Sequence, residues 1–161
     1  MGTLSLKELA ATGITITSTG ASTTNGSATS AGAGSLDMRA GGTAGALEPI
    51  AGYFELTCQW ATITNIVSGT IVADLYLVPS IDGTNYATVD TTASAGYISS
   101  ANRFGSFTNP LASPSATTNY RFSSPIGDCW PTLYTPYIIN RSGQTISVNW
   151  ALKFFPVEGQ Y

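Results

Sequence analysis

Alternation of apolar and polar residues is the feature that most limits how this chain can fold. In YFELTCQW (53–60) the apolar residues fall on the even positions, which are Phe54, Leu56, Cys58 and Trp60. A period of two places alternate side chains on opposite faces of a strand, so this segment predicts a strand with one buried face. No amphipathic helix of useful length is predicted after residue 12.

Two further segments alternate in the same way. In TIVADLYLV (70–78) we predict that one face carries Ile71, Ala73, Leu75 and Leu77. The opposite face carries Val72, Tyr76 and Val78 around Asp74, and we expect another chain or the N-terminal segment to cover it. In TISVNWALKF (145–154) we predict that the inward residues are Ile146, Val148, Trp150, Leu152 and Phe154.

Turn residues separate these strands. Pro79 has no N–H to donate, so it is expected to end its strand. Asp82-Gly83 predicts a turn, after which Tyr86 begins the next strand. The NRSGQ segment (140–144) predicts a hairpin loop between LYTPYII and TISVNWALKF. With shorter strands in 97–107 and 119–130, these signals predict an all-β fold, an antiparallel β-sandwich that is jelly-roll-like, with an extended N-terminal arm.

We predict that the first 47 residues form the arm and that residues 48–161 form the β-sandwich domain. S-L-K-E (5–8) matches the capping box and predicts a short helix from about Leu6 to Ala11. ITIT (14–17) predicts a short strand. The small polar residues of 18–45 cannot bury enough apolar surface to offset the entropy of ordering. We therefore expect the arm to lie against its own domain or, as we favour, against a neighbouring subunit.

Charge is scarce in this chain. Of 161 residues, 43% are hydrophobic, which suits one domain with one core, and only 9% are charged, against about 25% in ordinary soluble proteins. We interpret this as a sign of assembly with other subunits. Four scattered arginines and a pI of about 4.6 argue against a nucleic-acid partner. No signal peptide or membrane span is recognised, so we expect synthesis in the host cytoplasm.

The residues that most catalytic sites need are missing. The chain has no histidine, which removes imidazole-based triads and most zinc catalysis. A carboxylate pair of Glu55 and Asp74 is geometrically conceivable, but each is better explained as a solvated or interface residue. Cys58 and Cys129 are interpreted as reduced core cysteines, although a disulfide is possible. We predict no enzymatic activity, no cofactor and no metal site.

The aromatic residues of WPTLYTPY (130–137) are the strongest candidates for a contact surface. Prolines hold Trp130, Tyr134 and Tyr137 in a rigid segment. Such aromatics can pack in the core, fill a pocket of another subunit or stack on sugar rings. All three roles stay open at this point.

Two segments resemble small structural proteins of tailed-bacteriophage virions. They are LYLVPSIDGTNYA and YIINRSGQTISVNWALKFFP, with their DGTNY and N-x-SG-x-x-I turns. The resemblance covers about residues 53–156, and in size and arm the chain is most similar to capsid decoration (cement) proteins. The resemblance implies a protein of the capsid surface that binds across major capsid protein subunits, often as a dimer or trimer, and strengthens the shell. It implies no catalytic residue.

We predict that the contact residues lie in the arm and in the aromatic segment. They are Leu4, Leu6, Leu9, Ile14, Ile16, Leu36, Met38, Arg39, Trp130, Tyr134 and Tyr137. A tail or neck component fits the sequence almost as well as a decoration protein. A glycan-binding module of a tail fibre that uses Trp130 is a further alternative.

Overall fold

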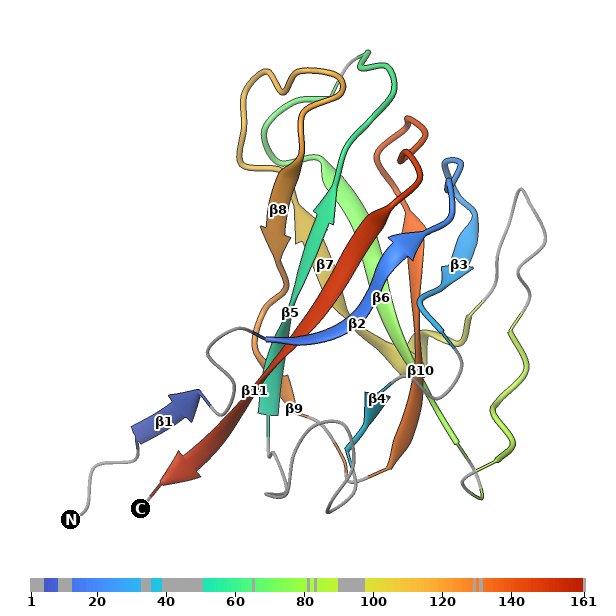
Figure 1. Cartoon of the computed structure of the whole chain (residues 1–161), viewed down its shortest axis with the longest axis vertical. Coiled ribbons are helices and arrows are strands. Elements are labelled where there is room, and N and C mark those ends of the chain that lie inside the picture. Colours follow the sequence, from blue (N-terminus) through green and yellow to red (C-terminus); the bar gives the residue numbers. More distant parts are fainter. Residues whose placement is uncertain are drawn as a thin grey trace.

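The chain folds as an antiparallel β-sandwich, as the alternation predicts. The computed structural model describes residues 5–8, 13–32, 36–38, 51–64, 66–80, 82, 84–89, 98–128, 130 and 132–160, and only the backbone of 5–8 and 158–160. Two sheets pack face to face (Figure 1). In the described part of the chain the helical structure is limited to a 3₁₀ turn, Ser100–Asn102.

The first sheet has the order β1–β11–β5–β8, with β2 also on β11 and β9 also on β5. Its strands are β1 (Ser5–Glu8), β2 (Ile14–Gly20), β5 (Ala51–Cys58), β8 (Tyr120–Ser123), β9 (Gly127–Asp128) and β11 (Trp150–Gln160). The second sheet has the order β3–β10–β6–β7, with β4 also on β10. Its strands are β3 (Ala28–Ser30), β4 (Leu36–Asp37), β6 (Ile71–Pro79), β7 (Arg103–Thr108) and β10 (Leu133–Asn140).

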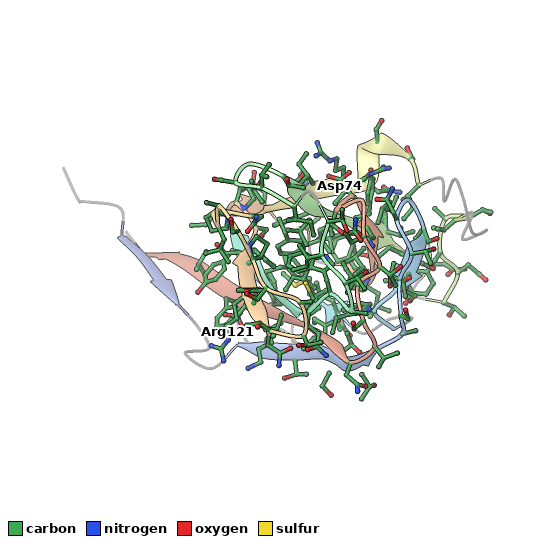
Figure 2. The ribbon with its side chains drawn as sticks, turned by 90° about the horizontal axis from the view of Figure 1, so that it is seen from above. Asp74 and Arg121 are labelled. Carbon is green, nitrogen blue, oxygen red and sulfur yellow. The ribbon has the colours of Figure 1, made fainter. Side chains whose placement is uncertain are left out.

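The core fills the space between the two sheets. The inward residues predicted for 53–60 are all correct, because Phe54, Leu56, Cys58 and Trp60 are buried. They pack against inward residues of the second sheet such as Leu75 and Ile138. Seen from above, the side chains crowd the space between the sheets (Figure 2). β6 ends at Pro79, as predicted.

Two inward predictions are wrong, each next to an irregularity of the backbone. Ile71 is exposed, because a register shift between Ile71 and Ala73 turns the buried Val72 into the core instead. Val148 is exposed because β11 begins only at Trp150, and Asn149 before it has a left-handed φ of 63°.

Three predicted elements also differ in the structure. β10 and β11 lie in different sheets, so the 140–144 segment crosses between sheets and is not a hairpin. Tyr86 makes only an isolated bridge with Ser80. Ser5–Glu8 is strand β1 and not the start of a helix, because pairing with β11 supplies backbone partners that outweigh a local capping signal; residues 9–12 lie outside the described part.

The outer face of β6 is covered by the chain itself. Tyr76 and Val78 form a second apolar cluster with Ala28, Ile98 and Ile139, and Tyr86, Ala87, Val89 and Tyr137 pack against it. Much of the cover comes from the segment after β6, through Tyr86, Ala87, Val89 and Ile98. Among the described residues of the N-terminal segment, Ala28 of β3 belongs to this cluster.

Strands of the N-terminal segment pair with strands of both sheets. β2 pairs with β11 in the first sheet, whereas β3 and β4 pair with β10 in the second. Ile16, Leu36 and Met38 are buried in the core cluster. The sequence left two surfaces open for this segment, its own domain or a neighbouring subunit. Its described residues 13–32 and 36–38 lie on the chain's own sandwich.

Candidate functional site

Four loop segments without an ionisable side chain meet at one end of the sandwich. They are 21–27 between β2 and β3, 59–70 between β5 and β6, 109–119 between β7 and β8, and 142–149 in the connection from β10 to β11, and none contains Asp, Glu, Lys or Arg. Arg141, which begins the connection from β10 to β11, is charged and is paired with Asp74. Figure 1 shows these loops together at the top of the molecule. We call this surface the neutral end.

Hydrogen bonds join these loops to one another. Gln144 Nε2 donates to the Thr64 carbonyl at 3.0 Å, and the Thr117 N–H donates to the Trp60 carbonyl at 2.8 Å. The Gly143 N–H donates to Asn25 Oδ1 at 3.0 Å. Bonds of this kind between different loops restrict their separate motion, so the neutral end is a preorganised surface.

Two buried asparagines anchor the loops. Asn140 is 0% exposed, and its Nδ2 donates to the carbonyls of Thr23 (2.8 Å) and Gln144 (2.6 Å). Its Oδ1 accepts from both the N–H and the hydroxyl of Ser142, at 2.9 and 2.7 Å. Asn140 thereby ties the N-terminal segment to the loop that precedes β11.

Asn109 has the same role on the other side of this end. It is 0% exposed, and its Nδ2 donates to the carbonyls of Val67 (3.0 Å) and Leu111 (2.9 Å). These bonds hold the 59–70 and 109–119 loops side by side, while the aliphatic side chains of Val67 and Leu111 face solvent. Val67 is 56% exposed and Leu111 37%.

The neutral end therefore presents aliphatic side chains from three loops. Val148 is 55% exposed, in addition to Val67 and Leu111, and Ile71 at the start of β6 is 40% exposed. Scattered single apolar residues are ordinary on a surface. Here the aliphatic side chains lie on hydrogen-bonded segments that carry no charge, and the neighbouring Arg141 is already paired with Asp74. Such a surface is typical of the centre of a protein contact, where charged residues are depleted.

A groove lies toward the opposite end, where β6 ends and β10 begins. Its volume is about 400 Å³, and it is lined by Leu77, Pro79, Ala101, Asn102, Arg103, Phe104, Asp128, Trp130, Thr132 and Tyr134. Trp130 is 77% exposed, the most exposed of the large apolar residues in the described part of the chain. We call this site the Trp130 groove.

Hydrogen bonds hold the backbone N–H and carbonyl of Trp130. Its N–H donates to the Tyr134 hydroxyl at 3.2 Å, and its carbonyl accepts from the Thr132 N–H at 2.8 Å. The Met38 N–H in turn donates to the Thr132 carbonyl at 3.0 Å. The indole is thus a platform on an anchored segment.

Arg103 connects this groove to an ion-pair network on β6. Arg103 Nη2 lies 2.8 Å from Asp74 Oδ1, and Arg141 Nε lies 3.0 Å from Asp74 Oδ2. Burial alone would raise the pKa of Asp74, but hydrogen bonds from Ser106, Arg103 and Arg141 outweigh it and hold that pKa below its usual value. In Figure 2 Asp74 lies on the opposite side of the molecule from Arg121.

The carboxylate pair considered from the sequence does not form. Glu55 lies on β5 in the first sheet, and Asp74 lies on β6 in the second. Asp74 is engaged with two arginines instead. In the described part of the chain no three His, Cys, Asp or Glu residues come together as metal ligands.

Cys58 is a free, buried cysteine on the inner face of β5. The prediction of a reduced core cysteine is therefore correct for Cys58, whereas Cys129 lies outside the described residues. Burial raises the pKa of the Cys58 thiol to about 12. A thiol with this pKa is not a nucleophile near neutral pH.

The predicted contact residues separate into three groups. Ile16, Leu36, Met38 and Tyr134 are buried within the chain, and Ile14 and Tyr137 are partly buried against its apolar clusters. Trp130 is exposed. Leu4, Leu9, Arg39 and the side chain of Leu6 lie outside the described residues. The structure thus brings Trp130 and Tyr134 together in the groove.

Sequence reasoning missed the neutral end. The four segments without a charge can be recognised in the sequence, but only the topology shows that they lie at the same end of the sandwich. The polar residues of the groove were also missed, because Asn102, Arg103 and Asp128 belong to segments that are distant from Trp130 or carry no motif.

Comparison with protein-family models, curated proteins and solved structures finds no match for this chain. The fold class, an antiparallel β-sandwich, therefore comes from the structure alone. Among the described residues no helix has the length and apolar character to cross a membrane.

Proposed function

We propose that the chain is a structural virion protein, a capsid decoration (cement) protein that binds across major capsid protein subunits as a dimer or trimer. The observation that carries the proposal is the neutral end. Its four segments carry exposed aliphatic side chains and no charge, and hydrogen bonds hold them in place. Little conformational entropy is lost when a preorganised surface of this kind binds a partner.

Two further features support this proposal. The scarcity of charge over the whole chain suits a protein that spends its life in contact with others. β1 and the end of β11 extend beyond the body of the sandwich (Figure 1). A two-stranded ribbon is marginally stable alone, so a neighbouring subunit would stabilise it.

The mechanism would be mechanical. The neutral end of each copy would cover the junction between capsid subunits, and a standard interface buries about 1,600 Å² in total. Weak contacts repeated over many copies add up to a stabilised shell. No reacting group is required for this role.

The test uses two matched variants in virions. Val148 (55% exposed) is at the neutral end and Ile126 (57% exposed) precedes β9 at the other end, so each is changed to Asp. We expect Val148→Asp to remove the protein from purified particles, whereas Ile126→Asp should leave its copy number unchanged, as measured by quantitative mass spectrometry. Normal incorporation of Val148→Asp would refute the role of the neutral end.

Copy number separates this function from its closest alternative. Hundreds of copies in each particle are expected for a decoration protein. A dozen copies or fewer would instead favour a tail or neck component. Deletion of residues 1–45 is unsuitable as a test, because it removes β2, β3 and β4 from the two sheets.

A further inference from the structure

We propose that the Trp130 groove is a binding site for neutral pyranose sugars. The groove is separate from the neutral end and goes beyond the capsid function proposed above. Its volume of about 400 Å³ falls within the range of roughly 300–1,000 Å³ that ligand sites occupy. A large exposed aromatic ring on an anchored backbone and several polar side chains around it are the parts that sugar recognition needs.

Trp130 supplies the stacking surface. A pyranose ring has one face of C–H groups, which packs favourably on the flat face of an indole. The side chain is 77% exposed, while the N–H and carbonyl of Trp130 are both hydrogen-bonded within the chain. A sugar would therefore cover an exposed apolar ring without any rearrangement of the backbone.

The rim supplies hydrogen-bonding groups for hydroxyls. The carboxylate of Asp128 accepts hydrogen bonds, and the amide of Asn102 both donates and accepts them. Arg103 uses Nη2 for Asp74 and Ser106, and its guanidinium has further N–H groups to donate. Sugar hydroxyls donate and accept, so this mixture matches them.

Charge argues for a neutral ligand. Asp128 would repel a phosphate or a carboxylate, and the positive charge of Arg103 is already paired with Asp74 at 2.8 Å. A nucleotide or an acidic sugar therefore finds no unpaired cation among the described residues that line the groove.

A proline-rich peptide fits the groove less well. Such peptides dock between several exposed aromatic ridges. In this groove Trp130 is the most exposed aromatic ring, whereas Tyr134 is buried and its hydroxyl accepts the Trp130 N–H. Phe104, which also lines the groove, is partly buried with its ring packed edge-on against Phe54. The structure thus favours a sugar over a polyproline segment.

The experiment uses tryptophan fluorescence of the full chain. Trp60 and Trp150 are 0% and 1% exposed, so acrylamide should quench mainly Trp130. Cello-, malto- and chito-oligosaccharides, an acidic oligosaccharide and a proline-rich peptide are each added at millimolar concentrations. We expect at least one neutral oligosaccharide to protect Trp130 in a saturable way, and the acidic sugar to have no effect.

Variants then locate the site by isothermal titration. Trp130→Ala should weaken binding about tenfold or more, as expected for a central aromatic contact. Ile126→Ala, at an exposed apolar position outside the lining of the groove, should bind as the unchanged chain does. Because Trp130 is exposed, its replacement should leave the fold intact, which circular dichroism checks.

Three results would overturn the proposal. They are protection by the proline-rich peptide alone, no protection by any neutral oligosaccharide, and sugar binding that survives in Trp130→Ala. None of them bears on the capsid test, which concerns Val148 at the other end. Loss of the capsid function would likewise leave the groove experiment unchanged.

Discussion

Replacement of Asn140 by alanine should destabilise the whole sandwich, because this one side chain holds the N-terminal segment and the 142–149 loop together. It makes four hydrogen bonds, to the carbonyls of Thr23 and Gln144 and from the N–H and hydroxyl of Ser142; the bond to Gln144 is part-buried and the other three are buried. Each such bond contributes about 0.5–1.5 kcal/mol net. The lower part of that range applies for two reasons. The Thr23 carbonyl keeps the Ile146 N–H as a donor, and the Ser142 hydroxyl, once released from Asn140, is within reach of the Gln144 carbonyl at 3.0 Å.

The expected loss is therefore roughly 3 kcal/mol in the free energy of unfolding. Urea denaturation followed by circular dichroism measures it as a lower midpoint with an unchanged slope. Asn119→Ala, at an exposed asparagine of the same end, is the control and should change the free energy by less than about 0.5 kcal/mol. A loss below about 1 kcal/mol for Asn140→Ala would refute the reasoning.

Three more predictions concern packing, charge and a thiol. Gly20→Ala should cost about 1–3 kcal/mol of stability in urea unfolding, because its Cβ would overlap the indole ring of the buried Trp150. The pKa of Asp74 is lowered in the folded state, so ionised Asp74 stabilises the fold fully above the unfolded pKa of about 3.9, and this stabilisation is lost as pH falls through the folded pKa. The difference in the free energy of unfolding between the unchanged chain and Asp74→Asn should therefore shrink in acid. In a Cys129→Ser background, Cys58 should react with a thiol reagent at pH near 8 only after unfolding, because its pKa is about 12.

Each of these predictions has an opposing outcome. Unchanged stability for Gly20→Ala would mean that the strand shifts away from Trp150 without strain. If the difference in the free energy of unfolding between the unchanged chain and Asp74→Asn stays constant from neutral to acidic pH, the arginine pairs do not stabilise the carboxylate. Fast labelling of Cys58 in the folded protein would show that the core opens readily.

The faces of the strands could be predicted from the sequence, whereas their arrangement could not. A period of two determines which side chains share a face, so Phe54, Leu56 and Cys58 were placed correctly. The period carries no information on backbone irregularities, so Ile71 and Val148 were placed wrongly. It also does not say which strands pair, and β10 and β11 were therefore assigned to one hairpin although they lie in different sheets.

The candidate sites were predictable only in part. Trp130 stood out because it lies in a segment rich in aromatics and prolines. The groove around it also needs Arg103 and Asp128, which only the folded chain brings near it. The composition of the N-terminal segment did not show which surface it lies against, whereas in the structure Leu36 and Met38 are buried in the core of the chain's own sandwich. A few apolar residues among many small ones are enough when partner strands supply the backbone hydrogen bonds.

The pairing of the N-terminal segment has a consequence for the order in which this protein can form. β2, β3 and β4 pair with β11 and β10, which follow them by more than 90 residues. During translation β2, β3 and β4 have no strand to pair with until residues 133–157 have left the ribosome. Folding is then expected to be slow and largely post-translational, because distant segments must meet before either sheet is complete.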